Sequence, residues 1–195
     1  MKFALRLSGG QDRALVFARG GGLVAVVADG ASGTAAADAV VEAVRKSPAV
    51  VDWVALLSEV DARLSSATPR EGAGAQTTAV VVAIAAGRIS GASVGDSGVW
   101  IIDGDDVTDL TAGQQRKPLI GSGHARPVGF AAPAEGGRAL LATDGLLKYA
   151  AQRFVAEAAS GASLDACADQ LLALPRLRSG QLPDDVAVIL IALDA

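Results

Sequence analysis

Two apolar segments that lie far apart in the sequence end in the same way. Residues 23–28 run directly into Asp29-Gly30, and residues 139–143 run into Asp144-Gly145. A third acidic pair, Asp184-Asp185, stands immediately before the last apolar segment of the chain. A carboxylate at the end of a buried strand faces solvent, caps a helix or holds a cation, because burying it alone is costly. We interpret these three strand ends as parts of one metal site around which the fold is built.

Strand-like and helix-like segments are grouped along the chain and do not alternate regularly. Apolar and β-branched runs predict strands at 2–7, 14–18, 23–28, 77–85, 89–94, 99–102, 106–110, 138–142 and 186–193. Amphipathic spacing predicts helices at 35–45, 51–64 and 163–174, with further helical structure from 145 onward. Asp103-Gly104 is typical of a hairpin turn. This order predicts an α+β fold of antiparallel sheet with helices on its outer faces, and argues against a doubly wound parallel sheet.

The composition favours one folded, soluble domain over residues 1–195. Hydrophobic residues make up 51% of the chain, which argues against disorder. Apolar runs such as residues 79–86 are far shorter than the roughly 20 residues that cross a bilayer. The N-terminal residues lack the apolar stretch of a secretory signal, and the single cysteine, Cys167, cannot form an internal disulfide. We therefore expect a cytoplasmic protein.

The charged residues also narrow the chemistry. The net charge is −4, and no basic stripe follows any segment, so nucleic acid is a poor candidate partner. His124 is the only histidine, which argues against a His-rich zinc site or a Ser-His-Asp triad. Asp12, Asp29, Asp144 and Asp184 all stand at or next to strand ends. Oxygen ligands of this kind suit Mg²⁺ or Mn²⁺. Taken singly, each Asp-Gly pair reads more simply as a turn or helix-cap aspartate.

The ordered set of motifs is more specific than any single pair. It resembles, block by block, the motif series of the metal-dependent protein phosphatases of the protein phosphatase 2C family. The matching blocks are Gln11-Asp12, residues 26–33, residues 77–80, residues 92–97, residues 141–146 and residues 184–189. The resemblance therefore extends over nearly the whole chain.

This resemblance implies a four-layer α-β-β-α sandwich, with a central antiparallel β-sandwich flanked by helices and a two-metal centre at one edge. Asp29 would bridge two Mg²⁺ or Mn²⁺ ions, and Gly30 would offer its carbonyl. Asp144 and Asp184 would hold one ion, and Asp12 would act near the other through water. In such a centre a hydroxide bridging the ions attacks phosphorus in line, with Asp29 and Asp144 as catalytic ligands.

Two further acids follow from the same resemblance. Asp96, together with Asp144, matches the acids that hold a third ion in bacterial members of the family. Asp185 stands where the family frequently has Asn and is not expected to be a ligand. The implied activity is hydrolysis of phosphoserine or phosphothreonine in a phosphorylated protein substrate, counteracting a serine/threonine kinase. We expect a monomer with no membrane partner.

The sequence departs from the family at the phosphate-binding arginine. The usual position is Leu7, one residue after Arg6, and Arg13 is another cation nearby. Arg6 is our candidate for gripping the phosphate, and a solvated charge on an edge strand is an equally good interpretation. Gly98 also replaces a common arginine, and Ala31 replaces the His or Met that follows Asp-Gly. These changes leave the metal ligands intact.

Residues 111–134 correspond in place to the flap beside the family's active site. This segment is polar and rich in Gly and Pro, and contains Arg116, Lys117, His124 and Arg126, a cluster that could receive a phosphopeptide. A solvated loop fits equally well, and a surface role is favoured for His124 over that of a proton donor. Cys167, within an Ala- and Leu-rich helical pattern, is predicted to be a core residue.

Two alternatives to a protein phosphatase remain open. A pseudophosphatase would keep the fold and bind a partner without catalysis, which the missing arginine favours. A sporulation-type phosphatase would act on a regulatory protein or on small phosphate esters, and the Asp184-Asp185 pair also resembles that branch. Retention of all the acids favours the enzyme, since a binding module has no need of carboxylates at buried strand ends.

Overall fold

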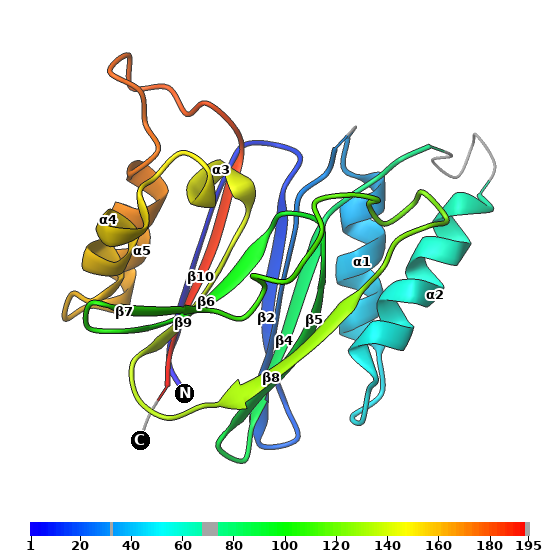
Figure 1. The fold of residues 1–195 in the computed structure, drawn as a ribbon, viewed down its shortest axis with the longest axis horizontal. Helices are drawn as coiled ribbons and strands as arrows, with labels where there is room; N and C mark the ends of the chain where they lie inside the picture. Colours follow the sequence, from blue (N-terminus) through cyan, green and yellow to red (C-terminus); the bar gives the residue numbers. More distant parts are fainter. Residues whose placement is uncertain (32, 68–73, 194–195) are drawn as a thin grey trace.

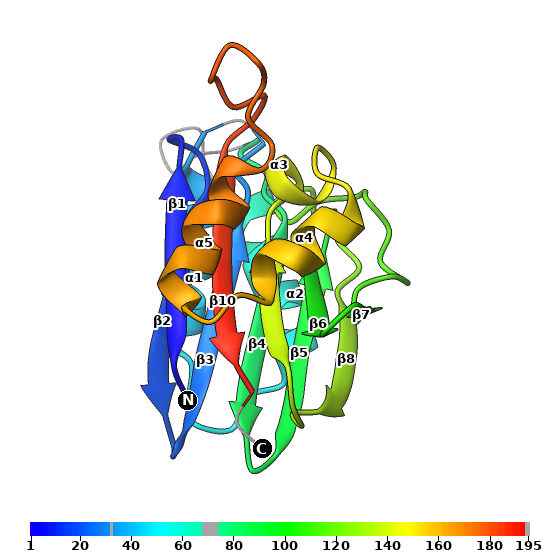
Figure 2. The ribbon, with the colours of Figure 1, turned by 90° about the vertical axis from the view of Figure 1, so that its left-hand side faces the viewer.

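The computed structural model describes residues 1–31, 33–67 and 74–193. Two antiparallel sheets lie face to face, and helices cover the outer face of each, so that the molecule has four layers (Figures 1 and 2). The predicted α+β class and the α-β-β-α sandwich implied by the resemblance are therefore confirmed. None of the helices among the described residues is long and apolar enough to cross a membrane.

One sheet carries the first Asp-Gly pair. Its strands, in spatial order, are β2 (Arg13–Arg19), β3 (Gly22–Ala28), β4 (Ala79–Ala85), β5 (Arg88–Val94) and β8 (Val128–Pro133). Helices α1 (Ala35–Lys46) and α2 (Trp53–Ser65) pack on its outer face through an apolar cluster that includes Val40 and Leu57. Asp52 begins α2 by accepting a hydrogen bond from the Ala55 amide.

The other sheet carries the second Asp-Gly pair and the last strand. Its order is β1 (Phe3–Ser8), β10 (Val186–Ala192), β9 (Arg138–Ala142), β6 (Gly98–Asp103) and β7 (Asp106–Asp109). The short helix α3 (Asp144–Leu147) follows β9 directly, and α4 (Gln152–Ala159) and α5 (Leu164–Ala173) cover the outer face. Cys167 is buried in this outer layer, as predicted.

The central strands are apolar on both faces because each lies between a helical layer and the opposite sheet. In β3, Leu23, Ala25 and Val27 face the other sheet, whereas Val24 and Val26 face the helices. Strand β10 alternates in the same way between the inter-sheet core and the layer of α4 and α5. Burial on both sides explains why these segments read as continuous apolar runs.

The flap prediction needs a correction. Residues 111–134 do not form one long loop, because residues 128–133 form the edge strand β8, which pairs antiparallel with β5. This strand escaped detection because it is mostly exposed and contains Gly129 and Pro133, which are poor strand formers. The predicted hairpin at Asp103-Gly104 is confirmed by the pairing of β6 with β7.

Candidate functional site

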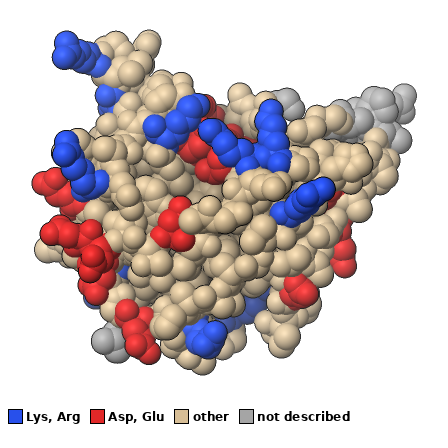
Figure 3. Space-filling model, viewed as in Figure 1, with Lys and Arg blue, Asp and Glu red and all other residues tan. Residues whose placement is uncertain are grey.

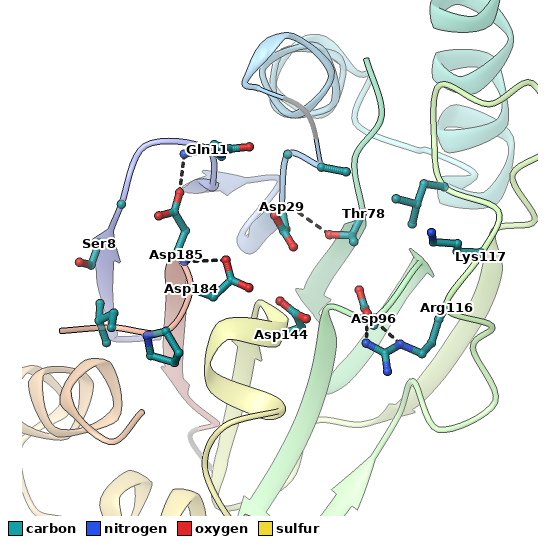
Figure 4. Close-up of a pocket in the computed structure, with 16 residues that line it drawn as sticks. Ser8, Gln11, Asp29, Thr78, Asp96, Arg116, Lys117, Asp144, Asp184 and Asp185 are labelled. Atoms are coloured by element: carbon teal, nitrogen blue, oxygen red, sulfur yellow. Dashed lines mark hydrogen bonds and ion pairs between the residues drawn. The ribbon is translucent and has the colours of Figure 1, made fainter. Parts of the chain in front are cut away.

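A cavity of about 980 Å³ opens at one end of the sandwich, where the predicted strand ends meet. Five acidic residues from separate segments line it: Asp29, Asp96, Asp144, Asp184 and Asp185. Figure 3 shows acidic side chains in a hollow of the surface with basic side chains around it. Figure 4 shows Asp29, Asp144 and Asp184 directed toward a common space, whereas Asp185 is turned toward Gln11. The structure thus brings together the three strand ends singled out in the sequence.

Asp29 is fixed by its own backbone at the end of β3. Its amide donates to the Thr78 hydroxyl at 3.0 Å, and its carbonyl accepts from the Thr77 hydroxyl at 2.7 Å and the Thr78 amide at 2.9 Å. The Thr78 and Ser97 hydroxyls are also bonded to each other, at 2.6 Å. These contacts leave the Asp29 carboxylate directed at the cavity (Figure 4). Burial raises the pKa of Asp29; a hydrogen bond with Asp12 opposes this rise, and the charges of Asp184, Asp96 and Asp185 add to it.

Gly30 is a glycine because the backbone is crowded there. A Cβ at this position would collide with the carbonyl oxygen of Gly33 and would approach that of Gln11 at 3.0 Å. Without a side chain, Gly30 lines the cavity with its backbone. This arrangement is compatible with the carbonyl role implied by the family resemblance.

Asp144 begins α3, immediately after β9. Gly145 next to it packs against the Asp185 carbonyl so closely that a Cβ would collide with that oxygen. Burial raises the pKa of Asp144 to about 6, with further contributions from the Asp96, Asp29 and Asp184 charges. Lys148 Nζ lies 3.8 Å from Asp144 Oδ2.

Asp12 lies behind the cavity and is 1% exposed. Its Oδ2 accepts a 2.7 Å hydrogen bond from the Thr143 hydroxyl, which in turn accepts from the Ala187 amide at 2.9 Å. Its Oδ1 is buried and has no hydrogen-bond partner. Burial raises the pKa of Asp12 to about 8, and the charge of Asp29 contributes. A buried oxygen in this state needs a proton or a cation.

Asp184 and Asp185 play different parts despite being adjacent. Asp185 Oδ2 accepts from the amides of Gly10 at 2.8 Å and Gln11 at 2.6 Å, so this carboxylate anchors the turn between β1 and β2. Asp184 is exposed, and its Oδ1 accepts only from the Asp185 amide, at 3.0 Å, among the contacts described for it. The Asp184 carboxylate is therefore the more accessible of the two, and its role as an ion ligand stays a prediction.

Asp96 is paired with a cation from the loop after β7. Its Oδ2 accepts from Arg116 Nε at 2.9 Å and from Nη2 at 2.6 Å. Lys117 lines the cavity beside Arg116, and Figure 4 places both on the side opposite Asp184 and Asp185. The hydrogen bond to Asp96 raises the pKa of Arg116 further above its ordinary value, so this side chain stays positive.

The donor set suits hard divalent cations. Within residues 1–31, 33–67 and 74–193, no three acidic, His or Cys side chains are close enough together to hold an ion as they stand. However, the cavity offers only oxygen donors from its acids, the Asp12 oxygen lacks a partner, and the acids raise one another's pKa. Positive charge would relieve each of these costs, so these residues fit Mg²⁺ or Mn²⁺.

Comparison with solved structures gives strong matches over the whole chain. A bacterial serine phosphatase superposes with a TM-score of 0.86 at 19% identity, covering 99% of this chain and 98% of that one. The catalytic domain of the serine/threonine protein phosphatase PstP, in complex with two manganese ions, gives 0.79 at 21% identity over 98% and 97%. The serine/threonine phosphatase Stp1 from Staphylococcus aureus gives 0.83 at 17% identity over 98% and 94%.

The chain has the fold of these phosphatases. This agrees with the resemblance to protein phosphatase 2C seen in the motifs. The sequence matches no protein-family model and no sequence among the curated proteins. The likeness is therefore carried by the structure and by short motifs.

Arg6 is not at the site. It does not line the cavity, and its guanidinium binds two acids of α5, with Nε 2.6 Å from Asp169 Oδ1 and Nη2 3.0 Å from Asp165 Oδ1. Its position therefore does not support the phosphate-binding role we expected. The physical reason is local, because alternate residues of a strand point to opposite faces and β1 directs Arg6 toward the helical layer. Arg13 is likewise engaged, with Asp38 at 2.5 Å.

Several residues that support the site were not singled out from the sequence. Thr143 orients Asp12, Thr78 and Ser97 support the loop around Asp29, and the Gln11 side chain accepts from the Gly33 amide at 3.1 Å. These residues lie within the matching motif blocks, in which only the acids and Gly30 were assigned roles. His124 is exposed, is not among the residues lining the cavity, and bonds Ser122 through its amide.

Proposed function

We propose that this protein is a Mg²⁺- or Mn²⁺-dependent serine/threonine protein phosphatase. The observation that carries the proposal is the convergence of Asp29, Asp144 and Asp184, from three separate strand ends, on one open cavity. Burial raises the pKa of Asp29 and of Asp144, and the charges of neighbouring acids raise both further, so the charged state of this group is unfavourable in itself. It is the expected state of a site that binds divalent cations.

In the proposed site Asp29 and the Gly30 carbonyl would hold two ions, Asp144 and Asp184 would help to hold one of them, and Asp12 would act near the other through water. Asp96 and Asp144 would contribute to a third. Ions held there supply an activated water and neutralise the charge of a phosphate ester. The backbone contacts of Asp29 hold its carboxylate in place, and the Thr143 hydroxyl does the same for Asp12.

The proposed substrate is a phosphorylated protein, which makes the enzyme the counterpart of a serine/threonine kinase. The names of the structural neighbours support this class, and the cavity is wide enough to admit a side chain carrying phosphate. We further propose that the protein acts as a monomer in the cytoplasm.

The test is hydrolysis of para-nitrophenyl phosphate and of a phosphothreonine peptide with Mn²⁺, Mg²⁺ or EDTA. Activity is expected with either metal and should be lost in EDTA. Asp144→Asn should reduce kcat at least a hundredfold, because it removes a charged ligand. The exposed hairpin variant Asp105→Asn is the matched control and should behave as the wild type. Activity that persists in EDTA or in Asp144→Asn would overturn the proposal.

A regulator without catalysis is the second candidate, because Arg6 is held by α5 and the family's usual arginine position is a leucine. For such a pseudophosphatase, calorimetry would detect Mn²⁺ binding although no phosphate ester is hydrolysed. A third outcome, hydrolysis of the small ester without the peptide, would point to the branch that acts on small esters or on a dedicated regulatory protein.

A further inference from the structure

Besides its acids, the cavity has basic side chains in its lining. A phosphate dianion entering among five carboxylates is repelled unless positive charge meets it. Of the described residues that line the cavity, only Arg116 and Lys117 are basic. The inference below rests on the proposed function for its substrate but not for its geometry.

Arg116 has donors to spare in its present contacts. Nε and Nη2 both bond a single oxygen, Oδ2 of Asp96, so Asp96 Oδ1 takes no part in the pair. A guanidinium has five N–H donors in a planar fork, and two nitrogens are engaged with Asp96. The side chain remains 67% exposed. It is therefore held by one edge while its remaining donors stay accessible, which suits bidentate binding of phosphate.

The loop that carries Arg116 is fixed on both sides of it. Before it, the Gln114 side chain accepts a 2.8 Å hydrogen bond from the Ser93 hydroxyl of β5. After it, Ile120 exchanges two backbone hydrogen bonds with Thr77, at 3.0 and 3.1 Å, immediately before the residue that supports Asp29. Arg116 thus stands on a short span between two anchors, at a set place relative to Asp29 (Figure 4). Preorganisation of this kind is required of a group that orients a substrate.

We propose that Arg116 binds the phosphate group of the substrate, with Lys117 beside it, in place of an arginine on β1. Asp96 orients the guanidinium. The position lies about 110 residues downstream of the family's usual one in the sequence, yet the fold returns it to the same cavity. With Arg116 in this role, no arginine is needed at Leu7, and Arg6 is available to bind α5.

The test compares Arg116→Ala with Arg126→Ala. The sequence placed Arg126 in the same basic cluster, but in the structure it is exposed and does not line the cavity, so its variant is the matched control. The probe is inorganic phosphate titrated by calorimetry into protein with Mg²⁺, together with the Michaelis constant for para-nitrophenyl phosphate. Arg116→Ala should weaken phosphate binding and raise the Michaelis constant roughly 10- to 100-fold, the range for hydrogen bonds to a charged group. Arg116→Lys should fall between, because an ammonium lacks the fork.

The outcomes separate this inference from the proposed function. If the wild type hydrolyses esters and both Arg116 variants keep its phosphate affinity, the inference is overturned and the phosphatase stands. If no ester is hydrolysed but phosphate binding still depends on Arg116 and not on Arg126, the phosphatase is overturned and the phosphate site stands. An equal loss in Arg126→Ala would show a diffuse charge effect and would overturn the inference. Thermal unfolding checks that each variant is folded.

Discussion

Two aspartates, Asp12 and Asp61, are almost completely buried, but their carboxylates differ in how many hydrogen bonds they accept. Asp61, on α2, accepts hydrogen bonds from the Gly121 and Gly123 amides through Oδ1, at 2.7 and 3.0 Å, and from the Ala125 amide through Oδ2, at 3.0 Å. Asp12 has the Thr143 hydroxyl on Oδ2 and nothing on Oδ1. One carboxylate is saturated by the backbone, and the other is left incomplete at the edge of the acidic cavity.

The number of hydrogen bonds that each carboxylate accepts distinguishes a structural aspartate, Asp61, from a candidate functional one, Asp12. A buried carboxylate that only holds a loop should be satisfied on both oxygens, because an unmet oxygen costs free energy. Asp61 meets that condition and connects α2 to the loop that follows Arg116 and Lys117. Asp12 does not meet it, and its raised pKa, about 8, expresses the cost. Such a cost persists in a fold where a bound ion or a shared proton offsets it.

The largest effect is expected from Asp61→Ala. The substitution leaves three loop amides without their acceptor, one of them on the buried Gly121, and should lower the free energy of unfolding by about 3 kcal/mol. The loss should be the same in Mn²⁺ and in EDTA, measured by urea unfolding. Glu59→Ala, an exposed change on the same helix, is the control and should stay within about 0.5 kcal/mol. A loss below about 1 kcal/mol for Asp61→Ala would contradict a structural role.

Asp12→Asn should change the free energy of unfolding in the opposite direction from Asp61→Ala. Removal of a buried charge with an unsatisfied oxygen should raise the free energy of unfolding in EDTA by about 1 kcal/mol at pH 8. The wild type should gain about 2.7 kcal/mol from Mn²⁺ at a hundred times its dissociation constant. Asp12→Asn should gain less, because the cavity loses negative charge next to Asp29. If Asp12→Asn destabilises the protein in EDTA as Asp61→Ala does, the distinction between the two aspartates fails.

The sequence was sufficient for what depends on local pattern. Continuous apolar runs predicted the strands before Asp29 and Asp144, and the ordered motifs predicted that their ends meet. The sequence was insufficient where the hydrogen-bond partner of a residue lies far away along the chain. Arg6 bonds a helix 159 to 163 residues downstream, and Asp61 bonds a loop that begins 60 residues later. Neither partner can be inferred from neighbours in the chain. The ligand roles of the acids stay predictions until an ion is bound.

The edge strand β8 could not be predicted from the sequence either, because its burial pattern is weak. Its residues are mostly exposed, so the continuous apolar run that marks β3 and β10 is absent from its sequence. Its place is fixed by hydrogen bonds to β5, which a single sequence does not display. The flap was therefore predicted too long by those six residues. Of its four predicted cluster members, Arg116 and Lys117 line the cavity, whereas His124 and Arg126 do not.

The smallest effect concerns Asp38, an exposed aspartate with one cationic partner. Its Oδ1 lies 2.5 Å from Arg13 Nε, and its side chain is 52% exposed. The hydrogen bond from Arg13 lowers the pKa of Asp38 below its ordinary value. A carboxyl with a lowered folded-state pKa stabilises the protein above its unfolded-state pKa, near 4, and loses that contribution as the pH falls through the folded-state value.

Asp38→Asn should therefore lower the free energy of unfolding at pH 6 by no more than about 0.5 kcal/mol, because solvent screens the pair. The difference from the wild type should shrink as the pH is lowered toward about 3, where the wild-type carboxyl takes up its proton. Urea unfolding at both pH values, in EDTA, measures it. Asp61→Ala should keep a large deficit at both, since its loop amides lack their acceptor regardless of pH. A difference for Asp38→Asn that grows on acidification would mean that the Arg13 pair is not what lowers the pKa.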